Sequence, residues 1–365
     1  MDSRLLTTLN AQAGSTRDPV VWAKTVCRAA SHFAAHGKTD EALIAIKNVR
    51  NQFGKDLHIN VASWLMLAEG VLHYFQARVP EAYDRIRRAY GLAIALRNDS
   101  AFPICAAWMA HIEFEACKYG EMAKHLEESI LTARPGDHQA IARSALILAV
   151  AYHIAGEFEM SRPWYEKARL NAAAEGDDAT VSATLHNMAS IRASNVRLED
   201  SFGGDAEKET KRVSLETASS LTYDYAIGHN GINFLARMLE GLVLTVDKKY
   251  DEAFRVLDSI STEQVPARLK PLILIDRAWC LANIGDQPHA WSIAKEAEGS
   301  LALVTEPDDL AYINSRLSQL ALVCQDVNAA ATYIQTARES LERHRSFQQE
   351  LLQILESIDK GSVRL

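Results

Sequence analysis

Two histidines four residues apart, His32 and His36, come closest to a metal-binding pattern, because residues at this spacing share one face of a helix. Glu121 and His125 have the same spacing. A zinc site needs three or four ligands, and no further ligand of matching spacing accompanies either pair. The sequence therefore predicts neither a metal site nor a cofactor.

Signatures of catalysis are also missing from the sequence. It contains no phosphate-binding loop, no GxSxG, no HExxH and no CxxC. Adjacent carboxylates such as Glu127 and Glu128 point to different faces of a helix, which favours solvated charges. A cluster of His111, His153 and His186 brought together by the fold is the one catalytic alternative. We expect a protein that is not an enzyme.

Composition favours a folded, all-α chain. Of its 365 residues 48% are apolar and 24% charged, with only 9 prolines and 17 glycines, and the segments between them are rich in strong helix formers. The net charge of −8 argues against direct nucleic-acid binding. Uncharged runs such as Ser144 to Gly156 fall short of the roughly 20 apolar residues that span a membrane. No signal peptide and no cysteine pair are recognisable, so we expect a cytoplasmic location.

The stretch YHIAGEFEMSRPWYEKA, Tyr152 to Ala168, reads as the joint of a helical hairpin. Gly156 is a helix stop, and Phe158 follows it. Ser161 and Tyr165 then continue at intervals of three and four residues, which keeps them on one face of a second helix. Aromatic rings are thus expected to close over small residues.

The same order recurs along the chain. The small or apolar residues that anchor each second helix are separated by 40, 40, 39, 92, 37 and 40 residues, and the interval of 92 leaves room for one longer unit; they are Ala42, Ala82, Met122, Ser161, Ala253, Ala290 and Ala330. This order resembles the tetratricopeptide repeat (TPR), without its leading tryptophan and closing proline. Long-repeat arrays of bacterial regulatory proteins share the style. The resemblance implies a right-handed α-solenoid of about eight hairpins, whereas armadillo and HEAT arrays share only the period.

Segment boundaries follow from this repeat. We expect a lead-in helix over 1–17, a repeat array over 18–343 and a C-terminal helix and tail over 344–365. The longer unit, 178–228, is expected to contain a charged loop over 197–216. The apolar residues of the last helix predict a cap on the array; self-association into a homo-oligomer is the alternative.

In TPR proteins the first helix of each hairpin lines a concave groove, so the resemblance also implies a binding face. Asn187 stands where peptide-binding relatives place an amide that brackets a ligand backbone. Tryptophans at these positions either anchor a partner or pack between hairpins. The Lys, Asn and Arg set of chaperone-binding TPR proteins is not found together. The expected groove residues are Lys24, Arg28, Trp64, Tyr74, Trp108, His111, Arg143, His153, His186, Asn187, Asp276, Trp279, Tyr312, Arg316 and Gln319.

These observations predict a regulatory scaffold or adaptor that binds a peptide or a segment of a partner protein in the groove. The alternative is a regulator gated by a small ligand or signalling peptide that changes the pitch of the superhelix.

Overall fold

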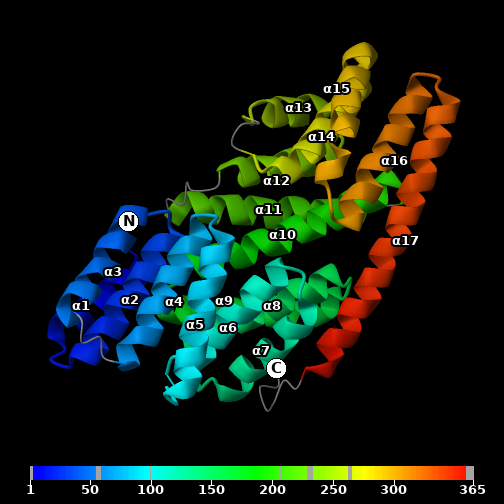
Figure 1. Ribbon diagram of the computed structural model, residues 1–365. Coiled ribbons are helices and arrows are strands. Elements are labelled where there is room, and N and C mark those ends of the chain that lie inside the picture. Colours follow the sequence, from blue (N-terminus) through cyan, green and yellow to red (C-terminus); the bar gives the residue numbers. More distant parts are fainter. Residues whose placement is uncertain are drawn as a thin grey trace. The chain divides into compact units, whose positions relative to one another are not determined.

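A computed structural model describes residues 3–54, 59–98, 100–204, 207–227, 233–261 and 265–358. The described residues form seventeen α-helices, two short 3-10 helices and no strand (Figure 1). The chain divides into two compact units. Unit 1 comprises residues 1–184, 227–231 and 351–365, and unit 2 comprises residues 185–226 and 232–350.

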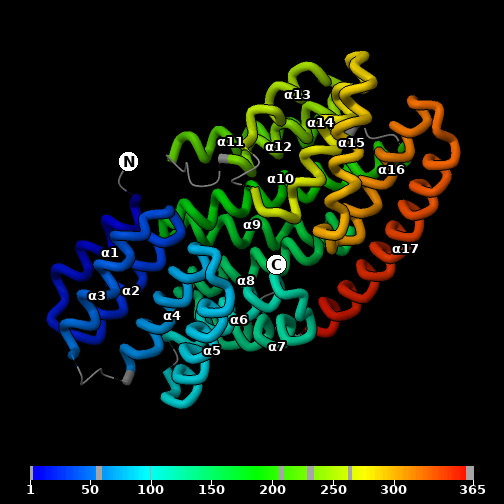
Figure 2. The backbone as a smooth tube through the Cα atoms, turned by 45° about the horizontal axis from the view of Figure 1, so that its top comes forward, coloured from blue at the N-terminus to red at the C-terminus, as the bar shows by residue number. Residues whose placement is uncertain are grey.

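Unit 1 begins with a single helix and continues as a series of hairpins. A first helix packs on its own second helix, and both pack on the next first helix, as the pairs α2·α4, α3·α4 and α5·α6 show. Figure 2 follows this succession along the chain. The helices are α1 (Arg4–Ser15), α2 (Pro19–Ala35), α3 (Thr39–Phe53), α4 (Ile59–Phe75), α5 (Val79–Ala95), α6 (Phe102–Glu115), α7 (Tyr119–Thr132), α8 (His138–Ile154) and α9 (Phe158–Glu175).

Unit 2 follows the same rule. The pairs α12·α13, α12·α14, α13·α14, α14·α15, α14·α16 and α15·α16 are in contact. Three helices contribute to both units: α10 enters unit 2 at Leu185, α17 enters unit 1 at Leu351, and the last residue of α11, Ile227, belongs to unit 1. The helices are α10 (Asp178–Ser201), α11 (Glu207–Ile227), α12 (Asn233–Val246), α13 (Tyr250–Asp258), η1 (Ala267–Leu269), α14 (Lys270–Ile284), α15 (Gln287–Gly299), η2 (Leu301–Leu303), α16 (Pro307–Val323) and α17 (Val327–Ser357).

The anchors of the repeat coincide with the helices that the spacing predicts. In all seven hairpins where an anchor was identified, the second helix begins three residues before it, from Thr39 before Ala42 to Val327 before Ala330. Every anchor is buried, and the most exposed of them retain only 3% of their surface. The helices α10 and α11 fill the interval without an anchor, so the order of helices confirms the eight predicted hairpins as α2/α3 through α16/α17.

The turn inside these hairpins is also constant. Its central residue, five positions before the anchor, has a positive φ whether it is a glycine, as at Gly156 (85°), or not, as at Cys117 (56°) and Lys248 (59°). The following N–H donates to a carbonyl five residues back at 2.8–2.9 Å, which ends the first helix in a Schellman-type cap. The hydrogen-bonded turn, rather than glycine itself, is what repeats.

Small residues bring the two helices of a hairpin together. At two equivalent positions, twelve before the anchor, this residue is glycine. A Cβ on Gly70 would lie 2.5 Å from Ile86, and one on Gly241 would lie 2.5 Å from Leu257. The other five hairpins have alanine or serine there, all buried. The close approach explains why the pattern admits no large residue at this position.

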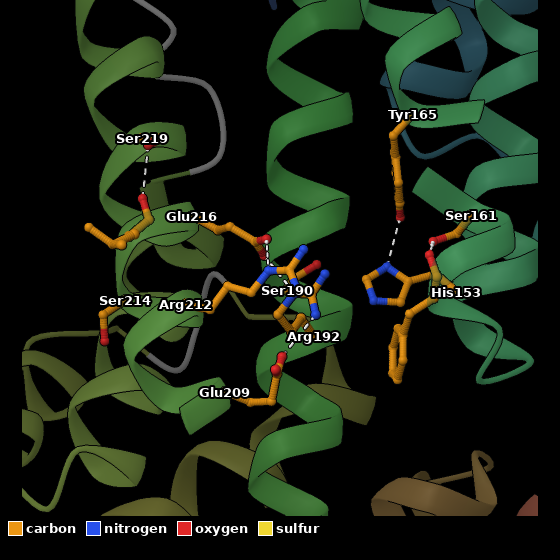
Figure 3. A network of polar contacts seen from close by, with 12 residues as sticks. His153, Ser161, Tyr165, Ser190, Arg192, Glu209, Arg212, Ser214, Glu216 and Ser219 are labelled. Carbon is orange, nitrogen blue, oxygen red and sulfur yellow. Dashed lines mark hydrogen bonds and ion pairs between the residues drawn. The ribbon is translucent and has the colours of Figure 1, made fainter. Parts of the chain in front are cut away.

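The predicted loop over 197–216 was wrong for most of its length. Helix α10 continues to Ser201, and α11 begins at Glu207. The charges of the run are paired across the two helices: Arg192 of α10 donates to Glu209 at 3.0 Å and to Glu216 at 2.8 Å (Figure 3). Because Arg192 is only 8% exposed, the carboxylates of α11 neutralise a buried charge, and a charge-dense run is held as helix.

The C-terminal helix also differs from the prediction. No break occurs near residue 344, since α17 runs continuously from Val327 to Ser357. Leu351, Leu355 and Ile358 are buried in unit 1, and the Tyr152 hydroxyl donates to the Leu355 carbonyl at 3.4 Å. These three of the apolar residues that suggested a cap or a self-association helix are thus covered by the chain itself, and self-association stays a prediction.

Within the described ranges, none of the helices is both long and apolar enough to cross a lipid bilayer.

Candidate binding site

Four of the expected groove residues come together in unit 1, on three consecutive first helices. Trp108 of α6 is 5% exposed, and the Arg143 guanidinium of α8 lies over its ring at 3.7 Å from the centroid. Tyr74 of α4 is hydrogen-bonded through its hydroxyl to His111 Nε2 at 2.9 Å. The Tyr74 ring meets both Trp108 and His111 edge to face, at 5.6 and 5.0 Å. We call these four residues the Arg143 cluster.

The electrostatics of the Arg143 cluster are those of a desolvated positive charge. Burial lowers the pKa of Arg143, although Asp177 and Tyr74 act in the opposite direction. Burial also holds the pKa of His111 well below its usual range, and Arg143 adds to this shift, so this imidazole is neutral at pH 7. Throughout the described part of the chain, Arg143 makes no hydrogen bond and no ion pair.

A second cation, Lys24, lies over the ring of a tryptophan, Trp64, in the same unit. The Lys24 ammonium of α2 lies 4.8 Å from the centroid of the Trp64 ring, and burial lowers the pKa of this lysine, with Arg28 adding to the shift. Arg28 itself is bonded to Glu175 of α9 at 2.5 Å. Trp64 is 6% exposed and packs between hairpins.

The histidine pair on α2 is a packing feature. The His32 and His36 rings lie 4.1 Å apart, and His32 Nδ1 is 3.9 Å from Asp177 Oδ1. Burial and then His36 lower the pKa of His32 to about 4, although Asp177 opposes them. His32 is therefore neutral at physiological pH. No group of three or more His, Cys, Asp or Glu side chains able to hold a metal ion is found among the described residues.

Unit 2 contains a second arginine on a tryptophan, but the terminal nitrogens of this one are hydrogen-bonded within the chain. Arg316 of α16 lies 4.2 Å from the Trp279 ring centroid of α14. Its guanidinium donates to Asp200 of α10 at 2.5 Å and to Gln319 at 2.7 Å. Gln319 in turn donates to the Ser201 carbonyl at 2.8 Å. Burial acts to lower the pKa of Arg316, but Tyr312 and Asp200 outweigh it and raise this pKa.

The pairing continues one turn along α10. Arg197 donates to Asp276 at 3.2 Å and lies 3.5 Å from Asp309. Its guanidinium is 4.1 Å from the Tyr312 ring centroid, and the Tyr312 hydroxyl donates to Asp276. Burial acts to lower the pKa of Arg197, but Asp276 and Tyr312 outweigh it and raise this pKa. These residues, with Arg316, Trp279, Gln319 and Asp200, form what we call the α10 network.

Several expected groove residues are corrected by these contacts. Asp276, Tyr312 and Arg316 are at most 3% exposed, because Arg197 and Asp200 of the same chain occupy the face on which a ligand was expected. His153 has no exposed surface and is hydrogen-bonded to the Tyr165 hydroxyl at 3.1 Å (Figure 3). It belongs to the core of the α8/α9 hairpin and is not accessible to a partner.

His186 and Asn187 lie on the part of α10 that belongs to unit 2, and both are half-buried. The Asn187 carbonyl accepts a hydrogen bond from Ser190 at 3.3 Å. Within the described residues no partner of the Asn187 side-chain amide is found, so its role as a backbone bracket stays a prediction.

Sequence reasoning missed the residues of α10 that complete the network. Arg197 and Asp200 lie three residues apart and so share a helix face, but both fell in the segment interpreted as a solvated loop. A helix extended through that run would have revealed them. Glu175, the partner of Arg28, carried no sequence signal at all.

Comparison with known proteins supports the fold alone. No protein-family model matches the chain, and no curated protein matches it. The crystal structure of the apo form of RapI superposes with a TM-score of 0.51 at 10% sequence identity, covering 90% of this chain and 88% of RapI. A tetratricopeptide repeat protein from Parabacteroides merdae is 12% identical over 92% of this chain and 99% of its own, with a TM-score of only 0.27. The fold places the protein in the class of all-α, TPR-like solenoids.

Proposed function

We propose that the protein is a cytoplasmic regulatory adaptor that binds a peptide, or a peptide-like segment of a partner protein, on the first-helix face of unit 1. The Arg143 cluster carries this proposal. Arginine, tryptophan and tyrosine are the residues that most often anchor protein interfaces, and here they lie on successive first helices. The same positions bind peptides in TPR arrays in general.

Accessibility also supports unit 1 over unit 2. Tyr74, His111 and Arg143 are half-buried, so each retains surface for a ligand. In unit 2 the arginine that lies over a tryptophan, Arg316, is 2% exposed and bonded to Asp200. A peptide on unit 2 would have to displace the chain's own α10, whereas none of the described residues bonds to Arg143.

Affinity selection from a library of random peptides would test the proposal. The affinity of wild type and R143E for peptides selected by the full chain is measured by fluorescence anisotropy. We expect R143E to weaken binding at least about tenfold, the scale of one lost charged contact, without loss of helicity. The matched control is R87E on α5, an arginine with a 62% exposed side chain that should bind like wild type. Failure to select any peptide, or equal binding by R143E, would contradict the proposal.

The alternative, a ligand-gated regulator, is favoured by the α10 network, because a buried set of charges has two discrete states, paired or separated. Hydrogen exchange of α10 with and without a selected peptide discriminates the two functions. A gated regulator loses protection over the second half of α10, whereas an adaptor does not.

A further inference from the structure

We propose that Arg143 binds a carboxylate of the peptide, so that the partner is recognised through a free C-terminus or an acidic side chain. This inference rests on the proposed function of the same face and names the chemical group that it takes.

The stacking on Trp108 decides which part of the guanidinium is available. One face of the planar group is covered by the ring at 3.7 Å, and Trp108 is itself buried, so the platform is fixed. A stacked guanidinium keeps its N–H donors at its edge, in a fork that matches two oxygens of one carboxylate. These donors have no acceptor within the described chain. A half-buried arginine whose edge is unoccupied is suited to bind an acceptor from outside.

The nearest compensating charge is occupied elsewhere. Asp177 acts on Arg143 electrostatically, but no Asp177 oxygen lies within 4.0 Å of it. Instead, Asp177 Oδ2 accepts from the Thr180 hydroxyl at 2.6 Å, and its other oxygen accepts from the Thr180 N–H at 3.2 Å. Burial has therefore desolvated Arg143 without placing a carboxylate in contact with it among the described residues, and an anionic ligand would supply that contact.

The charge of the surroundings favours a single negative charge. His111 beside Arg143 is neutral, and Arg28 is neutralised by Glu175. Lys24 lies among Arg28, Asp137 and Glu175, and it does not figure in the electrostatic surroundings of Arg143. One cation then faces the ligand, and Asp177 repels excess negative charge. A carboxylate matches this balance better than a phosphate dianion does.

An apolar surface adjoins the Tyr74 and Trp108 rings of the Arg143 cluster. Phe75 is 42% exposed, and its ring lies 5.2 Å from Tyr74 and 6.4 Å from Trp108. It offers contact to an apolar side chain next to the carboxylate. We therefore expect acidic groups that stand beside an apolar residue to be preferred.

Four peptide libraries of one length test the inference on the full chain. The first has free C-termini and no Asp or Glu, the second is amidated and contains Asp and Glu, the third is amidated and has neither, and the fourth resembles the third but contains phosphoserine. Each is selected on wild type, R143Q, R143K and the control R87Q. We expect wild type and R87Q to enrich the first or second library at least about tenfold over the third, the value of a charged hydrogen-bonded pair.

R143Q should abolish this preference, and R143K should restore part of it because it keeps the charge without the fork. Enrichment of the first library would identify a free C-terminus as the source of the carboxylate, and enrichment of the second would identify an acidic side chain. Equal enrichment of the neutral library would overturn the inference and leave the proposed function intact. Preference for phosphoserine would overturn it in favour of a phosphate site. No enrichment in any library would overturn both proposals.

Discussion

Each unit stacks an arginine on a tryptophan of a first helix, but the two arginines differ in what compensates their charge. Arg316 on Trp279 is 2% exposed and bonded to Asp200, and although burial acts to lower its pKa, Tyr312 and Asp200 raise it. Arg143 on Trp108 has no carboxylate in contact among the described residues, remains half-buried and has a lowered pKa. The same pair of residue types is structural in one unit and available to a ligand in the other.

This difference shows that a residue type on a repeat face does not define a binding site. What matters is whether the chain itself supplies the counter-charge. In unit 2 the acids of α10 and α14 do so through Asp200 and Asp276. In unit 1 the nearby acids Glu175 and Asp177 are bonded to other partners.

The largest expected effect concerns the α10 network. D276A removes the acceptor of both Arg197 and Tyr312 and leaves a buried charge without its closest partner. We expect a loss of about 3–5 kcal/mol in the free energy of unfolding, measured by urea denaturation. D84A on α5 is the matched control, because Asp84 has a 39% exposed side chain and its ion pairs among the described residues are with Arg87 and Arg88 of its own helix. A loss below about 1 kcal/mol for D276A would show that unit 2 does not depend on this pairing.

The pH dependence of stability should have opposite signs in the two units. Burial and Asp308 raise the pKa of Asp309 in unit 2 to about 7, despite Arg197. The folded chain then holds a proton that the unfolded chain has lost, so this group's contribution to stability falls as pH rises from its usual 3.8 to about 7. His32 in unit 1 has a pKa of about 4, so the unfolded chain takes up a proton first, and stability falls as pH drops from 6.5 to about 4.

Thermal unfolding between these limits checks both signs, with slopes of at most about 1.4 kcal/mol per pH unit for each group. D309N should flatten the loss of stability on the alkaline side, and H32Q should flatten the loss on the acidic side. If D309N or H32Q leaves the pH dependence of stability unchanged on its side, the substituted residue is not the cause of that dependence.

A smaller effect is expected for Arg143. R143A removes a cation over an aromatic ring but breaks no ion pair in the described chain, so the free energy of unfolding should fall by about 0.5–1 kcal/mol. R316A should cost several times more, because it leaves Asp200 without its partner. Equal costs for R143A and R316A in parallel urea titrations would abolish the distinction between the units.

The smallest effect concerns the turns, where the units are alike. Cys117 in unit 1 and Lys248 in unit 2 adopt φ values of 56° and 59°, which favour glycine. C117G and K248G should each stabilise the chain by about 0.5–1 kcal/mol, seen as a higher urea midpoint. The mirror change G156A should destabilise it by a similar amount. Unequal gains from C117G and K248G would indicate that the units differ in scaffold as well as in charge.

Much of the fold could be predicted because its signals are local. The anchors, from Ala42 to Ala330, mark where each second helix begins, and the turn and the close approach at Gly70 depend only on neighbouring residues. Helix periodicity and cap geometry act over less than one repeat, so they can be predicted without knowledge of the tertiary structure. The charged run after Arg197 was misread because its few apolar residues, such as Val213, give a weak pattern, while pairing with Arg192 helps to hold the helix.

Only part of the candidate site could be predicted from the sequence. Sequence alone placed Tyr74, Trp108, His111 and Arg143 on first helices, and the structure brings these four together. It could not tell Arg143 from Arg316, since both were placed on the inner face of a first helix, one helical turn apart in the repeat. The partners that decide between them, Asp200 for Arg316 and Asp276 for Arg197, lie 116 and 79 residues away along the chain. The sequence determined the repeats and the residues on their faces, because those follow from local geometry. Only the tertiary structure decided which charges are neutralised, because pairing across such separations depends on how distant helices pack.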